Sequence, residues 1–268
     1  NKTVVDALYN TADALTLNNN GTSTLKVVSI TDDGSATAAL TSLTLNGNVQ
    51  IGTQSGSSVT AVALGSSAGI TIDGATDNSQ VAVSLVAAAS GATNSVTLGN
   101  GNNNITDLTY AGDVTVVVGS GSNLINVGGT SLSNLLTGLV TITLGADNPN
   151  VNNDAIYLNA TNSTAPADVN VAVTGANTGD TVYFNEDLAT SLTYTASTAQ
   201  STLAATLSTL VTNVTAGTTD GLWSYLTFAG NTYLAENNYA SAADHITIVE
   251  LAGIHTFTAT TGGVVLAS

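Results

Sequence analysis

VTLGNGNNNI (96–105) and VVVGSGSNLI (116–125) repeat one pattern, in which a strand-like run leads into Gly-x-Gly-x-Asn-x-Ile. Two longer copies, ITLGADNPNVNNDAI (142–156) and VAVTGANTGDTV (171–182), keep the run and its first glycine and end in Asp-x-apolar. The leading glycines stand 20, 26 and 30 residues apart, at Gly99, Gly119, Gly145 and Gly175. A repeated strand, glycine turn and second strand predict units that stack, because one unit cannot bury its apolar face alone.

Alternation of apolar and polar residues extends this pattern toward the N-terminus. Strand-like runs occur at LKVVSI (25–30), LTLNGNVQI (43–51), VTAVAL (59–64) and VAVSLV (81–86). Much of the apolar content is Ala, Val, Leu and Ile, and small and β-branched side chains suit many thin, stacked layers. The sequence therefore predicts a mainly β protein whose body, residues 1–190, is a parallel β-roll or β-helix-like solenoid.

The C-terminal part of the chain departs from this pattern. In STAQSTLAATLSTLVTN (197–213) and the valine that follows it, apolar residues beginning at Leu203 fall at i, i+4, i+7, i+8 and i+11, which is the stripe of an amphipathic helix. The runs GLWSYLTFAGNTYLAE (221–236) and HITIVEL (245–251) follow and indicate an antiparallel sheet packed on that helix. We therefore expect residues 191–268 to form a small helix-plus-sheet cap.

Charge limits the partners that this chain can bind. It carries 18 acidic residues, two lysines and no arginine, for a formal net charge of −16. Nucleic acid and anionic membrane surfaces both require clustered basic residues, so we exclude them as partners. There is no cysteine, so neither disulfides nor thiolate metal sites can form. An excess of carboxylates favours calcium, which prefers hard oxygen ligands.

The turns of the repeat are the candidate calcium sites. In Gly-x-Gly-x-Asp-x-apolar, glycine exposes backbone carbonyls, the acidic side chain turns toward a cation, and the apolar residue returns the chain to the core. The acidic position is filled here by Asn103, Asn123, Asp154, Asp180 and Asp244. Neighbouring residues that could assist are Asp107, Asp113, Asp147 and Asn177. At Asn103 and Asn123 an alternative stays open, a metal-free turn held by asparagine hydrogen bonds.

Catalysis has little support in the sequence. The two histidines, His245 and His255, have neither a zinc-protease spacing nor a Gly-x-Ser-x-Gly partner. We therefore expect a protein that is not an enzyme.

These turns resemble the RTX (repeat-in-toxin) family of calcium-binding β-roll proteins, although GNGNNNI and GSGSNLI carry Asn where that family carries Asp. Residues 200–268 resemble the C-terminal segment of RTX proteins exported by type I systems, with WSYLTFAGNTYLAENNYASAADHITIVELAGI as the matching stretch. This resemblance implies an uncleaved export signal read by the type I export machinery. It also implies a calcium clasp formed by Glu236, Asn238 and Asp244. The alternative is that Asp244 merely starts a strand and Glu236 is solvated.

Composition and resemblance together favour one function. A chain rich in Thr, Ser, Ala, Asn and Gly, almost without lysine and lacking Cys and Met, resembles bacterial surface-layer proteins of the RTX type. We expect an extracellular, cell-surface structural subunit that self-assembles through calcium into a two-dimensional lattice of identical copies. The absence of a visible signal peptide suggests a fragment whose missing N-terminal region holds the cell-surface anchor. The alternatives are an RTX adhesin repeat region and the secretion module of an RTX exoenzyme.

Overall fold

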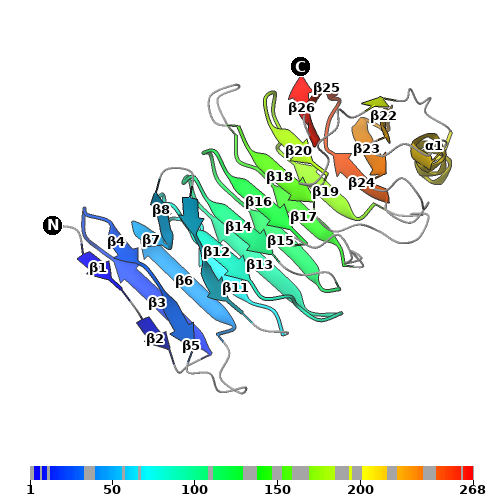
Figure 1. Cartoon of the computed structure of the whole chain (residues 1–268). Coiled ribbons are helices and arrows are strands. Elements are labelled where there is room, and N and C mark those ends of the chain that lie inside the picture. The colour runs from blue at the N-terminus through cyan, green and yellow to red at the C-terminus, as the bar shows by residue number, and fades with distance from the viewer. Residues whose placement is uncertain are drawn as a thin grey trace.

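The chain is mainly β, as the sequence predicts. The computed structural model describes residues 3–6, 8–10, 13–32, 40–55, 58–65, 68–107, 111–128, 138–146, 153–158, 169–184, 193–194, 201–215, 222–237, 246–260 and 262–267. Within these residues there is one α-helix, and the strands form two large sheets and three small ones. Figure 1 shows the strands in a row that runs from the N-terminal end to the C-terminal end.

Two large sheets face each other across the core. The eight-stranded sheet has the order β10 (Val62–Leu64), β12 (Ala82–Leu85), β14 (Asn104–Asp107), β16 (Leu124–Val127), β18 (Ala155–Leu158), β20 (Thr181–Tyr183), β26 (Gly263–Ala267) and β25 (Thr256–Thr260). The eleven-stranded sheet has the order β21 (Thr193–Tyr194), β22 (Leu222–Phe228), β23 (Asn231–Asn237), β24 (Ile246–Leu251), β19 (Val171–Thr174), β17 (Val140–Thr143), β15 (Asp113–Val117), β13 (Thr93–Leu98), β11 (Thr71–Gly74), β6 (Ser42–Gly47) and β3 (Ala14–Asn19).

From β11 to β20, successive strands alternate between the two sheets, and neighbours within each sheet are parallel. We call one strand of the eleven-stranded sheet and the next strand of the eight-stranded sheet a rung. Each rung repeats the strand, turn and strand that the sequence pattern predicts.

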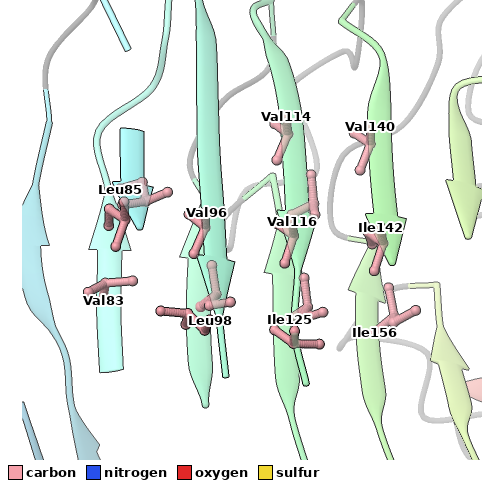
Figure 2. Packing of buried hydrophobic residues seen from close by; sticks show 14 of the residues in the cluster. Val83, Leu85, Val96, Leu98, Val114, Val116, Ile125, Val140, Ile142 and Ile156 are labelled. Carbon is pink, nitrogen blue, oxygen red and sulfur yellow. The ribbon is translucent and has the colours of Figure 1, made fainter. Parts of the chain in front are cut away.

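The core consists of equivalent side chains that stack from rung to rung. In the eight-stranded sheet, paired residues form a column of Val83, Ile105, Ile125, Ile156 and Val182. In the eleven-stranded sheet the equivalent column is Ile72, Val96, Val116, Ile142 and Val173. All ten are buried, and Figure 2 shows their neighbourhood as one apolar cluster. The apolar residue after each turn therefore returns to the core, as the sequence predicts.

The N-terminal part is less regular than the repeat. A parallel three-stranded sheet contains β1 (Thr3–Val5), β4 (Leu25–Val27) and β7 (Val49–Ile51), and two strand pairs join β2 (Leu8–Asn10) to β5 (Ile30–Asp32) and β8 (Thr53–Ser55) to β9 (Ser58–Thr60). The run 43–51, predicted as a strand, splits into β6 and β7 in different sheets. Gly47 has φ of +83° at this break, and an added Cβ there would lie 2.2 Å from Asn19 O.

The predicted helix and its sheet are both present. Helix α1 (Leu203–Thr215) begins after Thr202, whose Oγ1 accepts a hydrogen bond from Ala205 N at 3.3 Å. The antiparallel strands β22, β23 and β24 pack on it through a second apolar cluster. This sheet is not a separate layer, because β24 pairs in parallel with β19 and so extends the eleven-stranded sheet. The expected boundary near residue 190 lies outside the described residues.

The turns stack as closely as the strands. An added Cβ at Gly145 would lie 2.3 Å from Gly119 C, and one at Gly119 would lie 2.7 Å from Gly99 C, so these three glycines form a column. Gly175, which the sequence pattern aligns with Gly145, does not belong to this column. Its neighbour is the Leu144 carbonyl group, one residue away from Gly145, and its φ of +81° requires glycine.

None of the described helical residues forms an apolar segment long enough to span a membrane.

Candidate functional site

One polar residue stands directly before each of four successive strands of the eight-stranded sheet. Asn103 precedes β14, Asn123 precedes β16, Asp154 precedes β18 and Asp180 precedes β20. The register of these strands places the four residues in one column, which we call the Asn/Asp ladder. All four side chains are buried, with 1% to 3% of their surface exposed. The tertiary structure thus brings together four residues that the sequence analysis selected.

Each ladder oxygen accepts a hydrogen bond from the backbone of the rung before it. Asn103 Oδ1 accepts from Val81 N at 3.1 Å, and Asn123 Oδ1 accepts from Asn103 N at 3.2 Å. Asp154 Oδ1 accepts from Asn123 N at 2.8 Å, and Asp180 Oδ1 accepts from Asp154 N at 2.8 Å. The ladder therefore satisfies buried N–H groups, which are costly to leave without an acceptor.

The two asparagines also donate. Asn103 Nδ2 donates to Asn123 Oδ1 at 2.9 Å and to Gly101 O at 2.9 Å. Asn123 Nδ2 donates to Asp154 Oδ1 at 2.9 Å and to Gly121 O at 3.1 Å. An amide can accept and donate at once, whereas a carboxylate can only accept. These are the asparagine hydrogen bonds that the sequence analysis gave as the alternative to metal at Asn103 and Asn123.

The C-terminal half of the ladder is acidic. Asp154 and Asp180 lie in consecutive rungs, and the spacing of neighbouring strands is about 4.8 Å. Asp180 Oδ2 accepts from the backbone N–H of Asn177 at 2.7 Å, while Asn177 Nδ2 donates to Gly175 O at 2.8 Å. Asn177, one of the assisting residues, thus contacts the ladder through its backbone. Two carboxylates at this spacing disfavour simultaneous ionisation unless a proton or a cation lies with them.

Two other predicted ligands lie away from the ladder. Asp107 is buried at the far end of β14, where its Oδ2 accepts from Asn94 Nδ2 at 2.9 Å. Asp113 is exposed at the start of β15, and its Oδ1 accepts from Leu139 N at 2.9 Å. Both residues lie at the ends of the strands that are far from the ladder, so they do not contribute to it.

The predicted C-terminal clasp is described only in part. Glu236 lies on β23 and is fully buried, so the alternative in which it is solvated is wrong. It pairs across the sheet with Trp223 on one side and Thr247 on the other. Asn238, Asp244 and also Asp147 of the turn set lie outside the described residues. Within the described ranges, no three His, Asp or Glu side chains form a metal-ligand group.

Buried acids are unusually frequent in this chain. Five carboxylates are almost completely buried, namely Asp77, Asp107, Asp154, Asp180 and Glu236. The chain has only two lysines and no arginine, and Lys26 lies on β4 of the N-terminal sheet. Basic side chains are therefore too few to neutralise most of the 18 acidic residues. Buried charges require a partner charge, a metal ion or a proton.

The described aromatic and histidine side chains have structural contacts. His255 Nε2 lies 2.9 Å from Ala252 O, and Glu250 accepts hydrogen bonds from Asn231 Nδ2 and from the Tyr233 hydroxyl. Burial and the nearby Glu250 carboxylate raise the pKa of Tyr233. This phenol therefore stays protonated at neutral pH and is a poor nucleophile. His245 lies outside the described residues.

Asp77 and Asn94 are among the buried polar residues that the repeat pattern does not select. Asp77 accepts from Ser79 N and Val49 N, at 2.8 and 3.2 Å. Asn94, on β13, accepts from Ile70 N at 3.0 Å. Asp77 could have been found from the run DNSQV (77–81), in which an acidic residue stands shortly before a strand. Asn94 could have been found because it falls on the inward-facing set of its strand.

A scan against protein-family models, a search of curated proteins and a search of solved structures each found no match.

Proposed function

We propose that this chain is the C-terminal, calcium-binding region of a structural surface-layer subunit, and that its two-sheet stack is a β-roll-like solenoid. In this proposal the subunits assemble into a two-dimensional lattice on the bacterial cell surface after type I export. The observation that carries it is the burial of Asp154 and Asp180 next to each other in the ladder, in a chain with two lysines. A divalent cation is the neutralising partner that such a chain can recruit from outside the cell.

Asp154 and Asp180 are the pair on which calcium would act most directly. Their side chains follow one another in the ladder, so each raises the cost of ionising the other. A calcium ion at this end would use these carboxylates together with neighbouring carbonyl and amide oxygens, and the backbone of Asn177 already contacts Asp180. Calcium between the acidic surfaces of neighbouring subunits would similarly offset their repulsion.

Calcium is expected to raise the melting temperature of the protein and to drive it into ordered sheets. A ligand at one hundred times its dissociation constant stabilises the folded state by about 2.7 kcal/mol, which corresponds to a rise of several degrees. Calorimetry and light scattering during titration of calcium against a chelator would measure both effects, with negative-stain microscopy of the product. Stabilisation without assembly would favour the adhesin or the exoenzyme module. An unchanged melting temperature would contradict calcium binding.

Asp154→Asn provides the matched variant. An amide at this position keeps the acceptor for Asn123 and removes one of the two adjacent charges. Asn103 and Asn123 already place an amide at the equivalent position of their rungs. We expect the variant to melt higher than the wild type without calcium and to lose most of its response to calcium. Asp13→Asn, at an exposed position, should leave the response intact. A full calcium response in Asp154→Asn would show that calcium does not bind at the ladder.

A further inference from the structure

The turn 75–80, which lies between β11 and β12, contacts β7 of the N-terminal three-stranded sheet. Strand β7 belongs to the three-stranded sheet, and two of its amide groups reach this turn. Ile51 N donates to Gln80 O at 3.2 Å, and Val49 N donates to Asp77 Oδ1 at 3.2 Å. Ile51 also forms a parallel bridge with Val81. The attachment of β7 to the turn therefore depends in part on one side chain, that of Asp77.

The two oxygens of Asp77 have different surroundings. Oδ1 accepts from Val49 N and from Ser79 N, the latter at 2.8 Å. Oδ2 is buried and has no hydrogen-bond partner among the described residues. The side chain as a whole is 1% exposed. A buried carboxylate oxygen without a donor favours the neutral acid, because the charged form has lost its hydration and gained no replacement.

No basic group offsets this burial at close range in the described structure. Strands β6 and β7 and the next turn, 99–103, carry no titratable side chain. Asp73, on β11, is exposed, and its Oδ1 accepts from Ala75 N. Lys26, on β4, is paired with Gln50 in the register of the sheet. Burial raises the pKa of Asp77 from its ordinary 3.8 to about 6, and the hydrogen bonds from Ser79 and Val49 lower it in part.

We propose that Asp77 is a proton-controlled joint, whose neutral form favours docking of β7 on the turn and whose ionisation favours opening of β7 away from it. Opening would expose the carboxyl group and return it to water. The N-terminal sheet is then held more firmly in acid than at neutral pH. This property is independent of calcium and of the surface-layer function.

The direction with pH follows from linkage. Below pH 4 the closed and open states both hold the proton, so pH has no effect on opening. Between pH 4 and pH 6 the closed state keeps a proton that the open state has lost, so each unit rise favours opening about tenfold. Above pH 6 both states are ionised and the effect levels off. The opening constant is expected to rise on the order of 100-fold in total.

Native-state hydrogen exchange of Val49 and Ile51 would test the joint. Rates measured from pH 4 to pH 7.5 in chelator-containing buffer, corrected for intrinsic exchange, should give an opening constant that increases as described. Asp77→Asn keeps an oxygen for Val49 and Ser79 and cannot ionise, so its opening constant should be independent of pH. Asp73→Asn, in the same region but exposed, should follow the wild-type curve. A wild-type opening constant that is flat across this range would overturn the proposal.

A direct titration of the carboxyl group guards against a variant that does not fold. The carbon-13 chemical shift of the Asp77 carboxyl in the wild-type protein should change with a midpoint near pH 6. A midpoint at pH 4 or below would show that the closed state holds no proton, and the proposal would fall whatever the variants do.

Discussion

Replacing Asn123 with alanine is expected to lower the free energy of unfolding by about 3 to 5 kcal/mol. The change removes the acceptor of Asn103 N and of Asn103 Nδ2, and the donor to Gly121 O and Asp154 Oδ1. The backbone N–H of Asn103 would then be buried without an acceptor, and water cannot replace the lost partner at a side chain that is 2% exposed. Denaturant unfolding of the calcium-free protein would measure the loss.

Asn102→Ala is the matched control for this prediction. Asn102 Oδ1 also accepts a hydrogen bond from the backbone of the next rung, from Ser122 N at 3.0 Å, but it is exposed. Water can take over that hydrogen bond, so we expect a loss below about 1 kcal/mol. Equal losses in the two variants would mean that burial of the ladder does not determine its contribution.

Gly145→Ala is expected to destabilise the protein by about 3 kcal/mol or to prevent folding of the C-terminal rungs. The new Cβ would lie 2.3 Å from Gly119 C, 2.5 Å from Ser120 N and 2.7 Å from Gly119 O. All three atoms belong to the backbone of the preceding rung, so no side chain can rotate away. The rungs would have to separate at this turn, which would weaken the stacked core on both sides. Thermal unfolding followed by circular dichroism would detect the change.

Gly21→Ala separates this steric effect from the general cost of replacing glycine. An added Cβ there comes closest to the half-buried side chain of Asn19, whose Oδ1 lies at 3.2 Å, and meets no backbone atom of a neighbouring rung. We expect a change within about 0.5 kcal/mol. If Gly145→Ala were equally mild, the turns would not be as closely stacked as the glycine column indicates.

Much of the architecture could be predicted from local pattern. The helix at 203–215 was visible because its stripe recurs within one element, and the hairpin after it was visible because both strands lie next to each other in the chain. The run 43–51 was predicted as one strand because alternation continues through Gly47. Gly47 has a positive φ at the end of β6 and lies close to the backbone of Asn19, a tertiary contact with a residue that is distant in sequence.

The candidate site was predictable to a similar extent. The repeat selected Asn103, Asn123, Asp154 and Asp180, and the structure places all four in one column. It did not select Asp77, because the hydrogen-bond partner that matters, Val49, lies 28 residues earlier in a strand of another sheet. Asp107 and Asp113 are close to the ladder residues in sequence. A strand of a few residues nevertheless separates its two ends in space, and both residues lie at the strand ends that are far from the ladder.

The sequence by itself determined the period of the repeat, the apolar residue that follows each turn and the excess of acidic over basic residues. These are local or compositional properties, and each can be read without knowing which segments meet. Only the tertiary structure decided which residues stack, how deeply the ladder and Glu236 are buried, and that Gly175 is displaced by one residue from the glycine column. Those properties depend on the register between rungs, which is set by contacts between residues 20 to 31 positions apart.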